Sequence, residues 1–375
     1  MSYLNLLNVP FYMLAIIIPL AIFLSIVLEE FLFRTANKKK ILDNPGGRRL
    51  HKGAIPRVGG WSFFIVMAFT TMLILPLFHP YTVEEYNDLL PFLFGTGTLF
   101  IVGVVDDVEN LGSKIKLFFQ VVAATPMVIK MSEFKIYDFC FMDIVIMGIM
   151  VFVTVWIINA MNLIDGIDGL SSTIGILVMG ASLTAIVAGT SFISYIVCMC
   201  LFISLVVFWF YNMQKGTSRR KMFMGDAGSL VMGFIISIIV MHHWMHDISA
   251  SKAILPVTLG LLFIPLIDVF VVSITRYVEG RNPFKADLSH LHHKFLYCGL
   301  SAKKSLVCIV SICLLLAFVN YELRTYGRLV YLSADAICTT VMYLVLWYNK
   351  RKLSQQIKRH WDYKTGMYVE DLEVG

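Results

Sequence analysis

The chain has 375 residues, of which 58% are hydrophobic and only 15% are charged, and its mean hydropathy is +0.76. Soluble domains carry about 25% charged residues and fewer apolar ones, so this composition excludes a soluble globular domain and a disordered chain. The net charge of +6 could by itself indicate nucleic acid binding, but its meaning depends on where the charges lie relative to a membrane.

Eleven apolar segments follow one another along the chain, and each predicts a helix that crosses a bilayer, which requires about 20 apolar residues. They cover residues 11–33, 58–78, 90–105, 115–131, 139–161, 169–188, 191–211, 227–245, 253–275, 305–322 and 328–348. The first segment lacks the basic start and the small-residue cleavage site of a signal peptide. The sequence therefore predicts an all-α polytopic membrane protein, with residues 1–350 as one transmembrane domain and residues 351–375 as a cytoplasmic tail.

The Lys and Arg residues gather in alternate connections between these segments. If residues 34–57 are cytoplasmic, 26 of the 31 basic residues lie on the cytoplasmic side. Short cytoplasmic loops of membrane proteins carry such an excess of positive charge. We therefore predict an N-terminus outside and a C-terminus in the cytoplasm. The positive charge is then a matter of topology, and we expect no nucleic acid partner.

Five Asp residues lie at the cytoplasmic ends of the apolar segments, although a carboxylate in hydrocarbon costs about 2.5–3.5 kcal/mol. They occur in VVDDVENL, NAMNLIDGIDGL and FMGDAGSL and are Asp106, Asp107, Asp165, Asp168 and Asp226. Three clusters that are distant in the chain but share one predicted depth indicate a common site at the cytoplasmic surface. Mg²⁺ or Mn²⁺ would relieve their mutual repulsion. The alternative is that these residues only cap helix ends.

Asn159, Asn162, Asp165 and Asp168 are spaced by three residues. This spacing drifts by about 60° per step around a regular helix, so the first and last side chains would not share a face. Gly166 and Gly169 are expected to interrupt the helix. We therefore predict that the helix unwinds here into a loop that turns its polar groups toward one cavity.

Further polar residues lie near the same predicted surface. Phe223 precedes Asp226 and could stack on a base, and Lys114 or Lys116 could reach a phosphate. The connection after residue 275 contains imidazoles and guanidiniums, which suit phosphate oxygens; they include Arg276, Arg281, His290, His292 and His293. A zinc site and a solvated basic face are the alternatives for this loop. His242, His243 and His246 lie at the outer end of a segment, where an interfacial role is expected.

Six motifs together resemble one known family, in order, from about residue 43 to residue 300. They are HKGAIPRVGG (51–60), VVDDVENL (104–111), NAMNLIDGIDGL (159–170), YN at Tyr211 and Asn212, FMGDAGSL (223–230) and HLHHKF (290–295). The family is that of the polyprenyl-phosphate N-acetylhexosamine-1-phosphate transferases, glycosyltransferase family 4. The HxHH pattern is similar to the branch that initiates O-antigen, enterobacterial common antigen or teichoic acid synthesis, and less similar to the phospho-MurNAc-pentapeptide branch. Leu288 stands where the family often has Arg.

The resemblance implies an enzyme of the bacterial inner membrane. It would transfer N-acetylhexosamine 1-phosphate, by default GlcNAc 1-phosphate, from a UDP-sugar to undecaprenyl phosphate, and it would release UMP. The resemblance also implies Mg²⁺ as the cofactor, with Mn²⁺ as an alternative, and direct attack by the lipid phosphate is favoured over a covalent Asp intermediate. A homodimer is possible. An ion-coupled transporter is the main alternative, but it should place its carboxylates near the midplane of the membrane.

Residues 1–350 form the predicted catalytic domain, and the resemblance implies roles for individual residues in it. Asp226 and Asn162 correspond to the metal ligands, and Asp106 and Asp107 to the pair near the lipid phosphate. Asp165 and Asp168 fall where the family binds the nucleotide, and Phe223 where a ring stacks on uracil. The predicted catalytic residues are Asp106, Asp107, Asp165, Asp168 and His290. The remaining substrate-binding positions are Lys116, Asn212, Arg276, Arg281, His292 and His293.

Overall fold

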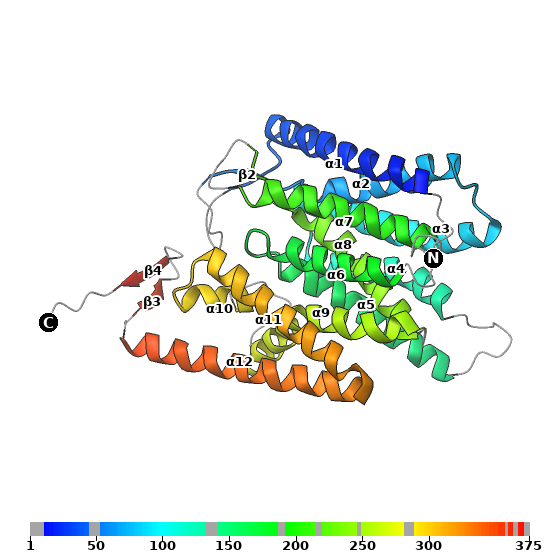
Figure 1. The fold of residues 1–375 in the computed structure, drawn as a ribbon. Helices are drawn as coiled ribbons and strands as arrows, with labels where there is room; N and C mark the ends of the chain where they lie inside the picture. The colour runs from blue at the N-terminus through cyan, green and yellow to red at the C-terminus, as the bar shows by residue number, and fades with distance from the viewer. Residues whose placement is uncertain are drawn as a thin grey trace.

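The computed structural model describes residues 11–44, 53–132, 141–186, 192–214, 220–245, 249–280, 289–356, 359–362 and 367–370. These residues form a bundle of helices whose axes run roughly along one direction (Figure 1). The long helices, in chain order, are α1 (Phe11–Lys39), α3 (Val83–Glu109), α4 (Ser113–Met131), α5 (Phe141–Leu163), α6 (Leu170–Ile186), α7 (Phe192–Asn212), α8 (Gly225–Met245), α9 (Ser249–Val278), α11 (Ala302–Leu323) and α12 (Arg328–Gln356).

Short elements connect the long helices. α2 (Trp61–Phe69) continues into a π turn, η2 (Thr70–Ile74), and a 3₁₀ turn, η3 (Leu75–Leu77). α10 (Leu291–Tyr297) precedes α11, and η5 (Arg324–Tyr326) joins α11 to α12. Two small antiparallel sheets pair β1 (Leu42–Asp43) with β2 (Ile55–Pro56) and β3 (Arg359–Asp362) with β4 (Met367–Glu370).

All eleven predicted apolar segments contain helix, so the prediction of an all-α polytopic membrane protein is confirmed. Among the described residues, eight helices are long and apolar enough to cross a bilayer. The apolar helices at Trp61–Leu77 and Leu170–Thr184 are shorter, and α4 carries Lys114, Lys116 and Lys130. The count of eleven crossings and the orientation therefore stay predictions. α12 runs six residues past the predicted boundary at residue 350.

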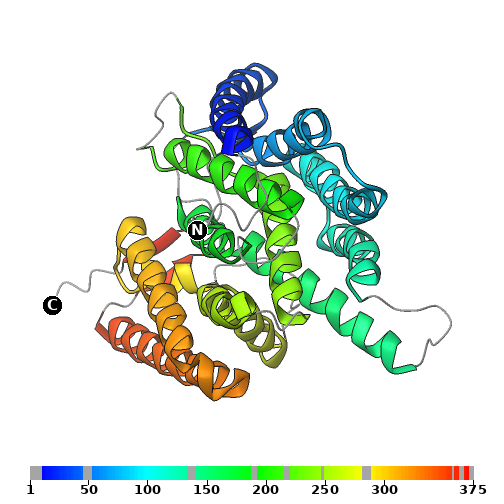
Figure 2. The ribbon, with the colours of Figure 1, turned by 45° about the vertical axis from the view of Figure 1, so that its right-hand side comes forward.

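α8 lies inside the bundle, and other helices surround it (Figures 1 and 2). Inside the protein, 83% of its apolar window is buried, the largest share among the eight helices. Small residues allow this close packing. A Cβ atom on Gly103 of α3 would lie 2.2 Å from Ala227 Cα, and one on Gly60 would lie 2.2 Å from Gly228 Cα. These contacts bring the first turn of α8 against the ends of α3 and the β2–α2 connection.

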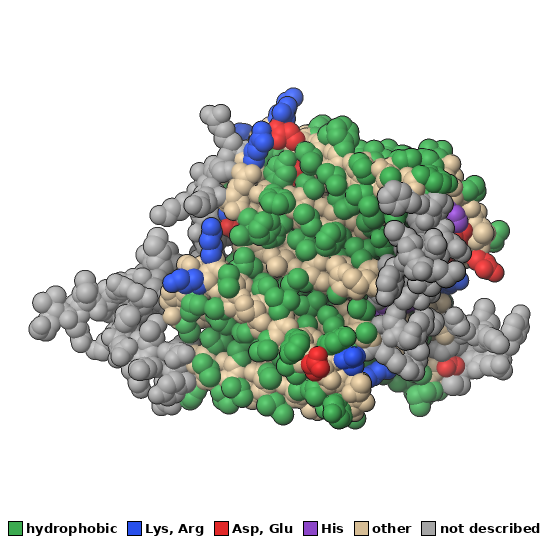
Figure 3. All heavy atoms as spheres, viewed as in Figure 1, with side chains coloured by type: hydrophobic (Ala, Val, Ile, Leu, Met, Phe, Trp, Pro, Cys, Tyr) green, Lys and Arg blue, Asp and Glu red, His purple; other side chains and the backbone are tan. Residues whose placement is uncertain are grey.

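The outer surface is apolar in the middle of the bundle. Figure 3 shows hydrophobic side chains over most of one face, whereas Lys and Arg side chains gather mainly at its left edge, where α1 ends in Figure 1. Large exposed side chains such as Phe23 of α1, Phe152 of α5 and Leu344 of α12 belong to this apolar surface. Such an extended apolar surface is typical of a protein whose solvent is lipid.

Candidate functional site

Asp226, the second residue of α8, lies between two cations that come from other parts of the chain. Lys116 of α4 donates from Nζ to Asp226 Oδ2 at 2.7 Å and to Asp106 Oδ2 at 3.2 Å. Arg57, which follows β2, donates to Asp226 Oδ1 at 3.2 Å. We call Arg57, Asp106, Asp107, Lys116 and Asp226 the charged centre. The ammonium group of Lys116 thus bridges two carboxylates that would otherwise repel each other.

Asp107 has a different environment from its neighbour Asp106. Its Oδ1 accepts from the backbone N–H of Asp226 at 2.7 Å, and its Oδ2 accepts from Ala227 N–H at 3.3 Å and from Trp61 Nε1 at 3.1 Å. The side chain is fully buried. Asp107 therefore satisfies the free amides of the first turn of α8, and a negative charge is favourable at that helix end.

Local sequence explains why these ends meet. Gly225 has a φ of +76°, and a Cβ atom there would lie 2.6 Å from Asp107 Oδ2. A glycine is therefore required for both the backbone conformation and the approach of the carboxylate. Backbone bonds from Gly59 and Gly60 to the carbonyls of Phe223 and Met224 fix the segment before α8 against the β2–α2 connection.

The prediction that the helix unwinds after Asn162 is confirmed, because α5 ends at Leu163 and α6 begins at Leu170. Three of the four polar residues have hydrogen-bond partners on different parts of the chain. Asn159 pairs with Gln120 of α4, Asn162 donates to Ser229 of α8 at 2.8 Å, and Asp168 accepts from Lys221 at 2.5 Å. The end of α5 and the loop that follows it therefore contact α4, α8 and the segment before α8, instead of presenting four groups to one point.

Asp165 lies in this loop, and no cation among the described residues pairs with it directly. Burial, together with the negative charge of Asp226, raises the pKa of its carboxyl group to about 7, while Arg57 opposes the shift. Burial also opposes the charge of Arg57, but the surrounding carboxylates outweigh this cost and raise the pKa of the guanidinium. Negative charge is therefore in excess around Asp165, and an incoming cation would be stabilised there.

The side toward Asp168 contains a lysine, a phenylalanine and an asparagine. Lys221 is buried, and its Nζ lies 5.8 Å from the centre of the Phe223 ring. Asn212, at the end of α7, accepts from Gly169 N–H at 2.6 Å and donates to the carbonyl of Met222 at 2.9 Å. Asn212 thus joins the α5–α6 loop to the segment that precedes α8 through two hydrogen bonds.

The histidines of α10 lie next to the same loop. A Cβ atom on Gly166 would lie 2.0 Å from His292 Nε2, so the glycine makes room for the imidazole. Burial lowers the pKa of His292 to about 3, and His293 adds to this effect. His292 is therefore neutral. The His293 ring lies 4.2 Å from that of His292 and 6.4 Å from that of Tyr297.

His290, at the start of α10, lies opposite Arg276 of α9. Nε2 of His290 lies 3.5 Å from a terminal nitrogen of Arg276, and both residues are buried. Nδ1 of His290 lies 2.9 Å from Asp268 Oδ2 on α9. The predicted residue Arg281 lies outside the described residues. His242 and His243 lie in the last turn of α8, at the end opposite to Asp226.

The oxygen donors of the charged centre fit a hard divalent cation. Within the described ranges, no group of three or more His, Cys, Asp or Glu side chains is arranged as a metal centre. Mg²⁺ is commonly held by one or two carboxylates together with substrate phosphates, so the protein need not supply a full ligand set. Asp226 is already bridged by an ammonium group, and Asn162 uses its Nδ2 for Ser229, which leaves its oxygen as the atom for a cation.

Sequence reasoning missed four residues of this region. Arg57 is part of the PRVGG motif, and Lys221 follows two arginines in a basic run. Asp268 is an ionisable residue inside an apolar segment, which is a signal for function that could have identified it. Nothing in the local sequence indicates Tyr343, which reaches Asp268 from α12.

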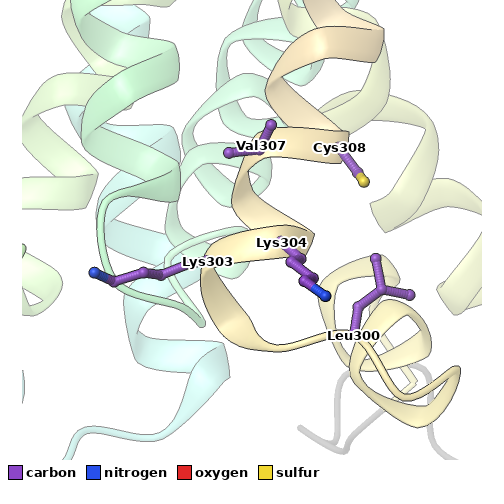
Figure 4. A pocket seen from close by; sticks show the side chains of 5 residues that line it. All are labelled: Leu300, Lys303, Lys304, Val307 and Cys308. Carbon is purple, nitrogen blue, oxygen red and sulfur yellow. The ribbon is translucent and has the colours of Figure 1, made fainter.

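A separate pocket lies at the start of α11 and is lined by Leu300, Lys303, Lys304, Val307 and Cys308. Figure 4 shows the ends of Lys303 and Lys304 pointing in different directions. Its accessible lining is apolar. This pocket therefore lacks the convergent polar groups of the charged centre.

Comparisons of the sequence with known proteins identify one family. The model of glycosyl transferase family 4 matches residues 89–243, which contain the ends of α3, α5 and α7 and the start of α8. The undecaprenyl-phosphate α-N-acetylglucosaminyl 1-phosphate transferase of Salmonella typhi is 31% identical over 315 residues, which cover 80% of this chain and 82% of that protein. The enzyme of the same name from Yersinia pestis is 28% identical over 80% of the chain and 82% of its own length.

A third relative is slightly less similar to this chain. The probable undecaprenyl-phosphate N-acetylglucosaminyl 1-phosphate transferase of Bacillus subtilis is 27% identical over 293 residues, which cover 76% of this chain and 77% of that protein. The similarity thus extends over most of the helical bundle, beyond the residues that the family model matches. The chain belongs to glycosyl transferase family 4, together with these polyprenyl-phosphate sugar-1-phosphate transferases.

Proposed function

We propose that the protein transfers GlcNAc 1-phosphate from UDP-GlcNAc to undecaprenyl phosphate in the bacterial inner membrane. UMP would leave, and the lipid-linked product would start a cell-surface polysaccharide. The observation that carries the proposal is the charged centre, in which Asp106 and Asp226 share the ammonium group of Lys116 at one end of the bundle. A site at the helix ends allows a phosphate headgroup to react while its isoprenoid chain stays in lipid.

The chemistry is a transfer between two phosphates. An oxygen of the lipid phosphate attacks the phosphorus that carries the sugar, and the bond from that phosphorus to the bridging oxygen of UMP breaks. Such transfers depend mainly on positioning and on neutralisation of charge. Lys116 and Arg57 are the cations nearest to Asp226, and they would move from the carboxylates to the substrate oxygens.

The two adjacent carboxylates at the end of α3 would have different tasks. Among the described residues, Lys116 is the cation that contacts Asp106, and we assign Asp106 to the lipid phosphate, as base or as orienting group. Asp107 is already engaged by two backbone amides and an indole. Its role is to hold the first turn of α8, and with it Asp226, in place.

Asp226 and Asn162 would hold Mg²⁺, or Mn²⁺ in its place. When bound, the cation would neutralise negative charge on the pyrophosphate of the donor. Asn162 is suited to this because Ser229 fixes its amide nitrogen. Asp165 adds negative charge to the same region, where no cation of the described residues pairs with it directly.

The nucleotide would lie toward the α5–α6 loop. Asp168 and Lys221 are paired there, next to the Phe223 ring on which uracil would stack. Asn212 supports this side through two backbone contacts. Arg276, Arg281, His290 and His293 would contact phosphate oxygens, while the buried and neutral His292 supports the loop at Gly166.

The test is release of UMP by the purified protein in detergent, with undecaprenyl phosphate, Mg²⁺ and a panel of UDP-N-acetylhexosamines. We expect turnover with UDP-GlcNAc that is lost in EDTA and lost by about 100-fold or more in Asp226→Asn. The lipid product is identified by mass spectrometry. The proposal is wrong if the folded protein forms no lipid-linked product with any donor, and a different product sugar would correct the donor.

A further inference from the structure

Asp268 joins three helices through its two carboxylate oxygens. This residue of α9 is only 3% exposed. Its Oδ2 lies 2.9 Å from His290 Nδ1, at the N-terminal end of α10. Its Oδ1 accepts from Leu291 N–H at 2.9 Å and from the hydroxyl group of Tyr343, on α12, at 2.8 Å. Each oxygen therefore has a defined donor, and none of these bonds is made within one helix.

These contacts define which nitrogen of His290 carries a hydrogen. A carboxylate only accepts, so Nδ1, which faces Asp268, is the donor. Nε2 lies 3.5 Å from the guanidinium of Arg276, which only donates. The lone pair of the neutral imidazole is therefore on Nε2. Asp268 on one side and Arg276 on the other select a single tautomer and one ring orientation.

Other charged and titratable groups also surround His290. The ring of His292 is parallel to that of His290 at 6.1 Å, and His293 adjoins His292. Lys294 of α10 lies over the Tyr343 ring at 4.5 Å. Among the described residues, the group within hydrogen-bond distance of Nδ1 of His290 is the carboxylate of Asp268. The carboxylate is thus the contact that decides the tautomer, and Tyr343 decides where the carboxylate lies.

We propose that Asp268 and Tyr343 are positioning residues for His290. Asp268 fixes the imidazole with Nε2 as the acceptor, and Tyr343 fixes Asp268 from the last helix of the bundle. This inference rests on the proposed function, in which His290 meets a substrate phosphate; the lone pair on Nε2 would accept the hydrogen of a phosphate hydroxyl group. It gives α12, which lies outside residues 89–243, a direct link to the site.

The test compares Asp268→Asn, Tyr343→Phe and the wild type in two independent measurements. The first is ¹⁵N NMR of histidine-labelled protein, in which the His290 signal is assigned by its absence from His290→Gln. In Asp268→Asn, the new amide N–H faces Nδ1, so the hydrogen should move to Nε2. The wild type should show the hydrogen on Nδ1. A wild-type hydrogen on Nε2 would overturn the proposal, whether or not the protein has activity.

The second measurement is steady-state kinetics of UMP release. We expect kcat to fall by about 10-fold or more in Asp268→Asn, with a change in KM for UDP-GlcNAc of less than about threefold. Tyr343→Phe should lower kcat by a smaller factor. Tyr331→Phe is the matched control, because Tyr331 is also buried on α12 but does not contact Asp268, and its kcat should be that of the wild type.

The outcomes separate this inference from the proposed function. Wild-type kcat in Asp268→Asn, or a loss that equals the loss in Tyr331→Phe, overturns the positioning role while leaving the transferase intact. If the wild type releases no UMP from any donor, the proposed function fails first. The NMR tautomer of His290 then decides whether Asp268 and Tyr343 position the ring.

Discussion

Two regions at opposite ends of the bundle both bury carboxylates, but they do so in different ways. In the charged centre, Asp226 contacts Lys116 and Arg57, and 14% of its side chain is exposed. Near the other end, Asp335 of α12 is fully buried and accepts from Asn320 of α11 at 2.8 Å. Asn320 also donates to the carbonyl of Pro256 in α9. Within the part of the chain that the structure describes, the second carboxyl group thus contacts an amide and no cation.

The difference separates a site from a packing contact. The charged centre has ionic groups that can exchange partners when anions or cations arrive, because Arg57, Lys116 and Asp226 come from different elements and are partly exposed. The Asp335 pair joins three helices, and within the described residues neither Asp335 Oδ1 nor Asn320 Oδ1 has a hydrogen-bond partner. A carboxyl group without a cation in an apolar interior is stable only when it is neutral. We therefore expect function at the first region and helix packing at the second.

The largest expected effect comes from removing the bridging ammonium. Lys116→Met should lower kcat/KM for UMP release by about 100-fold or more, because the ammonium group would no longer neutralise the negative charge of the substrate phosphates. It should also destabilise the protein by about 1–3 kcal/mol, less than for a fully buried pair, because 21% of the Lys116 side chain is exposed. The matched control is Lys114→Met on the same helix, which should keep wild-type activity because Lys114 is exposed. Equal activity losses in the two variants would contradict the assignment of Lys116.

A second substitution tests how the loop is held beside α10. Gly166→Ala places a Cβ atom 2.0 Å from His292 Nε2, so the ring or the loop must shift. We expect a loss of about 1–3 kcal/mol in stability, measured as a lower Tm, together with reduced activity. Gly148→Ala in α5 is the control, because its Cβ atom would have no neighbour within 4 Å. A Tm for Gly166→Ala as high as that of the control would show that the loop does not pack on His292.

A third prediction concerns pH. The pKa of Asp165 is raised to about 7 by burial and by Asp226, whereas an unfolded Asp titrates near ~3.9. The folded protein therefore binds the proton of Asp165 more tightly than the unfolded chain does. The stability that this protonation contributes is present at acidic pH and is lost as pH rises toward about 7. In cation-free buffer, Asp165→Asn should lose this pH dependence and have a higher Tm than the wild type at pH 8. If the Tm values of the wild type and of Asp165→Asn change in parallel from pH 5 to pH 8, Asp165 does not cause the pH dependence.

The smallest expected effect is at the other end of the bundle. Asp335→Asn replaces a neutral carboxyl group by an amide of the same shape, so kcat/KM should stay within about twofold of the wild type. The change in stability should be below about 1 kcal/mol, because no buried charge is left unpaired. A large loss of activity here, similar to that of Asp226→Asn, would remove the distinction between the two regions.

The sequence by itself determined the helical segments and the places where they end. Long apolar runs satisfy their backbone only as helices in lipid, and Gly166 and Gly169 predicted the break between α5 and α6. Carboxylates at three segment ends predicted one site, and the meeting of Asp106, Asp107 and Asp226 agrees with this. Such signals are local, because they depend on the period and polarity of neighbouring residues.

Only the tertiary structure decided which partner each polar group has. The sequence treats Asp106 and Asp107 as an equivalent pair, but one contacts an ammonium group and the other the amides of α8. It also gives no indication that Tyr343 reaches Asp268, 75 residues away in the chain. Hydrogen bonds and ion pairs depend on distances between helices, and those distances are set by close contacts such as Gly103 with Ala227. Packing between distant segments, which no local pattern encodes, therefore fixed the chemistry of each carboxylate.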